Sequence, residues 1–310
     1  MLRLVSTGGD APPAALVGPW AAGGRRFING YGPTETTVAV VVAECREELG
    51  SRLPIGLPIA NHRAYIIDSA GDLLPDGVPG ELAVSGPGLA RGYLHRPAAT
   101  AERFQPDPFA GRVGERMYRT GDLVRWRHDG QLEFLGRLDR QLKIRGNRVE
   151  PAEIESALLE APGVRQAAVE YLAHQGQLVG WVVGGESDDA ELREFLSLRL
   201  PPYMIPGKLN RLPGLPMTAA GKVDRCALRV SLGSEEEFDM ADGTHPVNDP
   251  EFVVVRNDED QYSIWAADRP LPAGWTAVGE PADRAACLEY IDKAWTDLRP
   301  RSVRALDGAR

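Results

Sequence analysis

Turn-forming residues punctuate the first part of the chain and limit how it can fold. Between residues 50 and 135, short β-type runs such as "HRAYIID", "GELAVSG" and "QLEFLG" alternate with Gly, Pro and Asp-Gly signals. Asp-Gly pairs tolerate the positive φ that tight turns require. Short strands with regularly recurring turns predict an antiparallel barrel or a distorted sheet.

After residue 136 the pattern changes to helices and strands. The segments "PAEIESALLEA" (151–161) and "DAELREFLSLRL" (189–200) each place their apolar residues on one helical face. Pro151 suits the first turn of the earlier helix. Two strand-like runs lie between these segments, so the order helix, strand, strand, helix predicts a small α+β unit.

A third pattern begins near Ser234 with an acidic, turn-rich stretch that suits a linker. Three strand-like runs follow, "EFVVVRND", "QYSIWAA" and "AGWTAVG", and an amphipathic helix is expected over 283–295. We expect this part to be a three-stranded antiparallel sheet with a helix. The chain is therefore predicted to form three domains, at residues 1–136, 137–232 and 233–310.

The composition excludes several classes of function. A net charge of −9 argues against a non-specific binder of nucleic acid. The longest apolar run, "VAVVVAEC", is far too short to span a bilayer. The three cysteines are widely spaced and odd in number, which favours reduced thiols, and no Cys/His spacing typical of a metal site is visible. We expect a cytoplasmic protein that binds neither nucleic acid nor membrane.

The loop "NGYGPTETT" (29–37) has the residues of a phosphate-binding turn. Backbone N–H groups and threonine hydroxyls in such loops contact phosphate oxygens. Glu35 could hold Mg²⁺, which prefers carboxylate and phosphate oxygens, and Tyr31 offers a flat face to a base. Taken alone, the loop is more often a turn that links two strands.

Three further residues are candidates for binding a nucleotide. Asp122, in "YRTGDLVRW", could accept two hydrogen bonds from a ribose diol, or it could simply form the turn. Arg137 opens the most basic stretch of the chain (136–155), which also marks the change of pattern and fits a hinge. Lys222 follows a glycine in "TAAGKVDR" and is by itself as readily a solvated residue.

Six segments, taken in order, resemble motifs of the adenylate-forming enzymes, specifically the adenylation domains of non-ribosomal peptide synthetases. The segments are "NGYGPTETT", "GELAVSGPGLARGYL", "YRTGDLVRW", "GRLDRQLKIRGNRVEPAEIE", "LPPYMIP" and "PMTAAGKVDR". The resemblance implies ATP- and Mg²⁺-dependent conversion of an amino acid to an aminoacyl-AMP. The acyl group then passes to the phosphopantetheine thiol of a peptidyl carrier protein. It also implies an α/β and α+β fold: part of a large subdomain with a β-barrel portion, then a small α+β subdomain.

The resemblance assigns roles to individual residues. The nucleotide contacts are Gly8, Gly9, Asp10, Asn29, Tyr31, Asp122 and Arg137. The catalytic residues are Thr34 on a phosphate, Glu35 on Mg²⁺, and Lys222 between the substrate carboxylate and the α-phosphate. Asp139 corresponds to the hinge of the small subdomain. Small neutral residues would line part of the substrate pocket: Val5, Thr7, Gly30, Val38 and Ala39.

The sequence departs from the family pattern in two ways. Ala220, Asn147 and Pro151 stand where Asn, an aromatic residue and Leu are usual. The family's Thr/Ser/Gly-rich phosphate loop and the Asp that holds the substrate amino group are not among residues 1–310. We therefore expect the chain to be nearly inactive alone. The alternative is a truncated, non-catalytic fragment that serves as a binding or scaffold partner, or one half of a split enzyme whose N-terminal half is on another chain.

The last part of the chain resembles a second family, the MbtH-like proteins, which bind adenylation domains and support their folding or activity. The resemblance lies in "NDEDQYSIWAADRPLPAGW" (257–275) and "WTDLRP", with Ala266 where Pro is common. It implies a docking surface of Ser263, Trp265 and Trp275, with Pro106 of "RFQPDPFAG" between the tryptophans. Either tryptophan could instead fill the core of its own domain.

Overall fold

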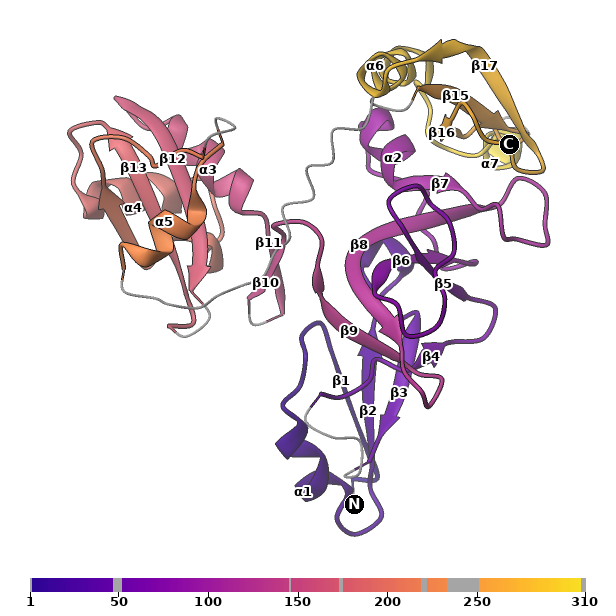
Figure 1. The fold of residues 1–310 in the computed structure, drawn as a ribbon, viewed down its shortest axis with the longest axis horizontal. Helices are drawn as coiled ribbons and strands as arrows, with labels where there is room; N and C mark the ends of the chain where they lie inside the picture. Colours follow the sequence, from indigo (N-terminus) through magenta and orange to yellow (C-terminus); the bar gives the residue numbers. More distant parts are fainter. Residues whose placement is uncertain are drawn as a thin grey trace. The chain divides into compact units, whose positions relative to one another are not determined.

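The computed structural model describes residues 2–46, 52–144, 146–172, 175–218, 222–232 and 251–307 (Figure 1). They form two compact units, Met1–Asp139 with His245–Arg310, and Arg140–Thr244. The first and third predicted domains thus lie largely in one unit. Within the described ranges, no helix combines the length and the apolar character needed to cross a membrane.

The first unit begins with a four-stranded sheet. Its strands, in spatial order, are β1 (Leu4–Gly8), β2 (Arg26–Tyr31), β3 (Val41–Cys45) and β4 (Leu57–Pro58). β1 and β2 run parallel, and the other pairs are antiparallel. Two short 3₁₀ turns, η1 (Ala14–Leu16) and η2 (Thr34–Thr36), and helix α1 (Val17–Ala21) complete this region. The parallel pair brings the loops after β1 and β2 to one edge of the sheet.

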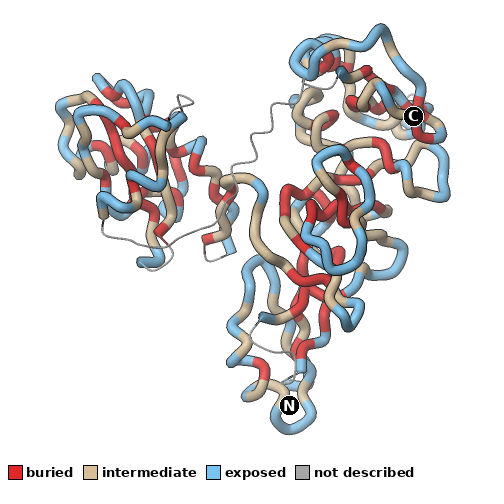
Figure 2. The backbone as a smooth tube through the Cα atoms, viewed as in Figure 1, coloured by how far each residue is buried: buried red, intermediate tan, exposed pale blue. Residues whose placement is uncertain are grey.

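A second, antiparallel sheet follows in the same unit. Its path is β5 (Arg63–Ile67), β6 (Gly80–Ser85), β8 (Arg116–Trp126) and β7 (Phe104–Pro106), with β9 (Leu132–Arg137) paired to β8. Figure 2 shows buried residues concentrated along the central strands. The sheet does not close on itself among the described residues. Of the two predicted forms, the distorted antiparallel sheet is therefore the one observed, and the expected barrel portion is an open sheet.

The C-terminal part of the first unit has the predicted three-stranded antiparallel sheet and helix. The strands are β16 (Tyr262–Ala266), β15 (Phe252–Asn257) and β17 (Trp275–Ala282), and the helices are α6 (Arg284–Ala294) and α7 (Arg301–Asp307). The Asp283 carboxylate caps α6 by accepting from Ala286 N at 2.8 Å. Figure 1 shows α6 beside α2 (Pro97–Arg103), a helix of the preceding part of the same unit.

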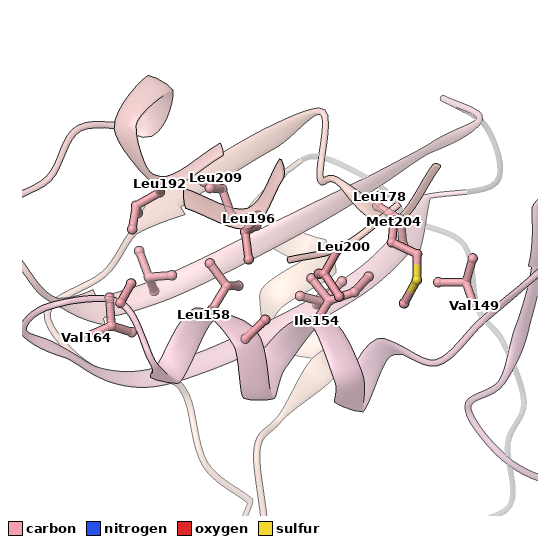
Figure 3. Packing of buried hydrophobic residues seen from close by; sticks show 14 of the residues in the cluster. Val149, Ile154, Leu158, Val164, Leu178, Leu192, Leu196, Leu200, Met204 and Leu209 are labelled. Carbon is pink, nitrogen blue, oxygen red and sulfur yellow. The ribbon is translucent and has the colours of Figure 1, made fainter. Parts of the chain in front are cut away.

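The second unit is the predicted small α+β unit. Its elements are the hairpin β10 (Leu142–Ile144) and β11 (Asn147–Val149), α3 (Pro151–Leu159), β12 (Val164–Leu172), β13 (Gln177–Gly184), α4 (Asp189–Ser197), η4 (Pro202–Met204), β14 (Lys208–Arg211) and α5 (Arg225–Val230). A sheet in the order β12-β13-β14 has α3 and α4 packed on one face through Leu158, Leu192 and Leu196 (Figure 3). Leu228 of α5 belongs to a separate cluster with Trp181 of β13.

Leu196 and Leu198 give a matched test of this core. Leu196 is 0% exposed in the cluster of Figure 3, whereas Leu198 is 78% exposed. Leu196→Ala should lower the free energy of unfolding of the second unit by about 2–5 kcal/mol, because it removes buried methyl groups and leaves a cavity. Leu198→Ala should change it by less than about 0.5 kcal/mol. Hydrogen exchange of the β12 and β13 amides measures both values, and equal effects would contradict this packing.

Candidate functional site

Asp122, Tyr31 and Arg137 form a buried network in the first unit. Asp122 is 1% exposed, and the register of β8 and β9 places it opposite Arg137. Its carboxylate accepts from the Tyr31 hydroxyl and from Arg137 Nη1, the latter at 2.6 Å. Three predicted nucleotide residues, far apart in the sequence, are thus brought together.

Arg137 also binds the predicted hinge residue. Its Nε and Nη2 atoms donate to the two carboxylate oxygens of Asp139 at 2.6 and 2.7 Å. Gly121, at φ +72°, lies against this pair, and a Cβ there would be 2.9 Å from both Arg137 Nη2 and Asp139 Oδ2. The glycine of the "TGD" turn therefore allows the backbone to approach the ion pairs closely.

Burial and neighbouring charge set the protonation of this network. Burial raises the pKa of Tyr31 well above its usual value, and the negative charge of Asp122 adds to the rise. Burial lowers the pKa of Arg137, but its bonds to Asp139 and the charge of Asp122 outweigh this, so the net shift is upward. Tyr31 thus remains a neutral donor. Its contribution to stability is fully present below the ordinary tyrosine pKa and is lost as the pH rises through the raised value.

Glu35 lies in η2 and is 5% exposed, whereas the neighbouring Thr34 is exposed. Glu35 Oε1 accepts from the Tyr93 hydroxyl at 2.7 Å, and its carbonyl oxygen accepts from Ala90 N at 2.8 Å. The hydroxyl oxygens of Tyr93 and Tyr118 are 3.3 Å apart. The predicted metal ligand is therefore held by both its side chain and its backbone.

The predicted adenine turn follows β1 at the edge of the first sheet. Gly8 pairs with Gly30, and a Cβ on Gly8 would lie only 2.9 Å from the Gly30 carbonyl oxygen. Gly9 has φ +86°, and Asp10 is exposed with Oδ1 accepting from Ala11 N at 2.8 Å. Asn29 is buried on β2, and its Nδ2 donates to the Pro54 carbonyl oxygen at 2.9 Å.

Three of the five predicted pocket residues, Thr7, Gly30 and Ala39, lie close together, and the other two lie elsewhere. An ideal Cβ on Gly30 would be 3.5 Å from Thr7 O and 3.8 Å from Ala39 Cβ. Val5 instead packs against the apolar cluster beneath α1. Val38 is 82% exposed at φ +69°. A β-branched residue with positive φ is strained, and such strain is often found at functional loops.

Lys222 belongs to the second unit. It is exposed, and its carbonyl oxygen accepts from Thr218 N at 2.7 Å. Lys222 N donates to Thr218 Oγ1 at 3.3 Å. Ala220, one of the departures from the family pattern, lies outside the described residues. Pro151 starts α3, and Asn147 begins β11, where its Nδ2 donates to Ile144 O at 3.3 Å.

The oxygen atoms of Thr34 and Glu35 in η2 are suitable ligands for a hard cation. The Asp122 carboxylate is less suited to a ribose diol, because its oxygens already accept hydrogen bonds from the protein. No group of three His, Cys, Asp or Glu side chains suited to a metal occurs in the described part of the chain. A magnesium ion shared with phosphates needs only one or two carboxylates, so Thr34 and Glu35 supply suitable donors. Both Asp122 oxygens already have protein partners, and a ribose would have to replace Arg137.

The C-terminal part of the chain contacts α2 through polar groups. Ser263 Oγ donates to Ala101 O at 2.7 Å, and both residues are fully buried. Asp292 Oδ1 accepts from Ala98 N at 2.9 Å in the first turn of α2. The strand β7 (Phe104–Pro106), which carries the buried Pro106, packs against β16.

A second contact involves the residues just before β8. Gly114 N donates to Ala273 O at 2.8 Å, and Asn257 Nδ2 donates to Gly114 O at 3.0 Å. Trp275 Nε1 donates to Glu115 O at 3.3 Å. Trp265 Nε1 instead donates to Pro270 O at 3.2 Å, inside its own domain. Both tryptophans also pack with buried valines of β15, so each contributes to that domain's core.

Several charged contacts of this interface could not be predicted from the sequence. Arg284 pairs with Glu102, and Arg269 pairs with Asp72. Arg269 Nη1 also donates to the Ala70 carbonyl oxygen at 2.7 Å. Exposed charges occur all over a protein surface, so a pattern in a single sequence does not reveal which of them pair.

Three protein families match separate segments of the chain. AMP-binding enzyme matches residues 1–94, AMP-binding enzyme C-terminal domain matches residues 153–222, and MbtH-like protein matches residues 243–307. The first two matches include the Asp10, Glu35 and Lys222 segments, and the third includes Ser263 and both tryptophans.

Similar proteins come from peptide-synthesising enzymes. The dimodular nonribosomal peptide synthase of Bacillus subtilis is 46% identical over 77% of this chain, which covers 10% of that protein. The phosphinothricin tripeptide synthetase of Streptomyces viridochromogenes is 43% identical over 80% of this chain and 23% of its own length. The chain thus spans only a small part of each of these relatives. The Vibrio cholerae adenylation domain AlmE, solved with glycyl-adenosine-5'-phosphate, gives a TM-score of 0.64 at 31% identity, over 76% of this chain and 45% of that chain.

Asp122→Asn tests the buried network. The change keeps the shape and an oxygen for Tyr31 but leaves the largely buried Arg137 with one carboxylate instead of two. We expect the free energy of unfolding of the first unit to fall by about 3 kcal/mol. Asp129→Asn, which weakens an exposed pair with Arg127, should cost no more than about 1 kcal/mol. Hydrogen exchange of the β8 and β9 amides gives both values, and equal losses would contradict the network's role.

Trp275→Ala tests the contact before β8. Removing the buried indole and its hydrogen bond to Glu115 should lower the free energy that stabilises the C-terminal domain by about 3–5 kcal/mol. Amide exchange at Gly114 and Glu115 should accelerate. Tyr290→Ala removes an exposed aromatic from α6 of the same domain and serves as the control. Unchanged exchange at Gly114 in Trp275→Ala would contradict the contact.

Proposed function

Because the chain joins segments of a non-ribosomal peptide synthetase adenylation domain to an MbtH-like domain, we propose that it takes part in activating an amino acid. The reaction consumes ATP and an amino acid and yields an aminoacyl-AMP and pyrophosphate. The acyl group then passes to the phosphopantetheine thiol of a peptidyl carrier protein. One of the similar solved structures is a protein that contains adenylation and PCP domains, which supports a carrier protein as partner.

The chemistry requires two anions to meet. A carboxylate oxygen of the amino acid attacks the α-phosphorus of ATP, and the bond to the pyrophosphate oxygen breaks. The Lys222 ammonium is the proposed cation between the two groups, where it offsets their repulsion as charge builds in the transition state. Its exposed position in the second unit is consistent with a residue that contacts a bound substrate.

The first unit supplies the proposed nucleotide contacts. The observation that carries this proposal is the network of Tyr31, Asp122 and Arg137, which gathers three motifs around one buried carboxylate. In this proposal a ribose diol donates to the Asp122 carboxylate in place of Arg137 Nη1. Arg137 would keep its bonds to Asp139 through Nε and Nη2 and present Nη1 to a phosphate. A magnesium ion bound at Glu35 would neutralise phosphate charge.

A second candidate is a binding partner without activity of its own. β1 is a sheet-edge strand paired in parallel with β2, and residues such as Leu4 on it are exposed. Parallel strands are normally covered on both faces. This favours a further polypeptide segment packed on that strand. In this form residues 1–310 bind that segment without activating an amino acid.

Amino-acid-dependent exchange of pyrophosphate into ATP separates the two candidates. Residues 1–310 alone should give little or no exchange, and addition of an N-terminal adenylation half from a relative should restore it. Lys222→Ala should then lower the restored rate about 100- to 1,000-fold. Lys208→Ala, an exposed lysine of the same unit, should leave the rate unchanged. Robust exchange by residues 1–310 alone would contradict the need for a second half, and no exchange in any combination would favour the binding partner.

A further inference from the structure

Helix α2 lies between the C-terminal domain and the candidate metal ligand. Two adjacent residues of α2, Thr100 and Ala101, are both fully buried. The Ala101 carbonyl accepts from Ser263 Oγ at 2.7 Å, and Thr100 Oγ1 accepts from Tyr93 N at 2.9 Å. One residue of the helix is thus bound to the C-terminal domain, and its neighbour is bound to the segment that carries Tyr93.

Tyr93 connects this helix to Glu35. Its hydroxyl donates to Glu35 Oε1 at 2.7 Å. Just before it, Gly92 approaches α2 so closely that a Cβ would be 2.3 Å from Thr100 Cγ2. A displacement of α2 therefore has to move the backbone of Tyr93. The route from Ser263 to the Glu35 carboxylate consists of three hydrogen bonds, the adjacent residues Thr100 and Ala101, and the side chain of Tyr93.

A second route from the same domain reaches the same segment. The domain binds residues Gly114 and Glu115 through their backbone groups. The next residue, Arg116, donates from Nη2 to Ala90 O and from Nη1 to Arg91 O, each at 3.0 Å. Ala90 N in turn donates to the Glu35 carbonyl oxygen at 2.8 Å. The two routes together constrain both the side chain and the backbone of Glu35.

We propose that Tyr93 is a positioning residue through which the C-terminal domain, residues 251–307, sets the position of the Glu35 carboxylate. Helix α2 has seven residues and no side-chain cap from its own N-cap residue, Arg96. So short a helix is marginal by itself, and Asp292 supplies the missing acceptor at Ala98 N. The domain thereby stabilises the helix on which Tyr93 depends. The role of Glu35 as a magnesium ligand rests on the proposed function, whereas the coupling does not.

Fluorine NMR of the full chain labelled with 3-fluorotyrosine tests the coupling at neutral pH without ATP or metal. The chain has eight tyrosines, and the signal that Tyr93→Phe removes is that of Tyr93. Glu35→Gln should shift this signal, which shows that it reports the hydrogen bond. Ser263→Ala should shift or broaden it too, whereas Ser302→Ala, at an exposed serine of the same domain, should not. A Tyr93 signal that responds to Glu35→Gln but not to Ser263→Ala would overturn the proposal.

A rescue experiment distinguishes positioning from packing and also covers the case in which Ser263→Ala unfolds the domain. Thr100→Val keeps the shape of the side chain but removes the acceptor for Tyr93 N, so it should shift the Tyr93 signal. Thr100→Ser keeps the hydroxyl, so the Tyr93 signal in this variant should match that of the unchanged chain. Equal shifts in both variants, or no shift in Thr100→Val, would refute the proposal. A Tyr93 shift, together with no pyrophosphate exchange even after an N-terminal adenylation half is added, would leave the coupling standing while the proposed function fails.

Discussion

The guanidinium of Arg137, shared between Asp122 and Asp139, is the interaction around which the first unit's candidate site is built. It joins a carboxylate in the middle of β8 to one that follows β9. Burying these charges is costly, and the cost is offset only because each carboxylate has a well-aligned partner. Tyr31 completes the shell by donating to Asp122. A ligand that takes Asp122 from Arg137 therefore changes the charge balance at Asp139, the last residue of the first unit's N-terminal segment.

Helix α2 adds the C-terminal domain to this arrangement. Its last residue, Arg103, has Nη2 3.5 Å from Asp139 Oδ2, while Thr100 holds the backbone of Tyr93. One short helix therefore contacts the C-terminal domain, the predicted hinge residue Asp139 and the segment that binds Glu35. Packed elements move as units rather than deform continuously. The contacts of the C-terminal domain with α2 therefore also constrain Asp139 and the segment that carries Tyr93.

The elements with strong periodicity were predictable, and the pairing between distant segments was not. The segments 151–161 and 189–200 form α3 and α4 nearly as expected, because their apolar spacing, Pro151 and the capping Asp188 all favour helices. The strands were expected, but closure of the barrel depends on register and twist, which short turn-punctuated runs do not encode. The Asp122–Arg137 pair depends on the β8–β9 register, which shifts between Leu123 and Val124. Motif resemblance indicated the individual residues but not the ion pair between Arg137 and Asp122.

The polar contacts of the interface accompany apolar packing of Ala101 in one cluster with Ile264 and Ile291, and they are consistent with joining the two partners in one chain. Its exposed ion pairs, Arg284–Glu102 and Arg269–Asp72, contribute about 0–1 kcal/mol each. The buried Ser263–Ala101 bond contributes about 1 kcal/mol net. Contacts of this strength bind weakly between separate molecules, which also lose translational freedom on association. Within one chain the effective concentration of the partner is high, so such contacts are strong enough to hold the domain on α2. The geometry of these hydrogen bonds and ion pairs then determines which groups of the C-terminal domain contact which groups of the preceding part of the chain.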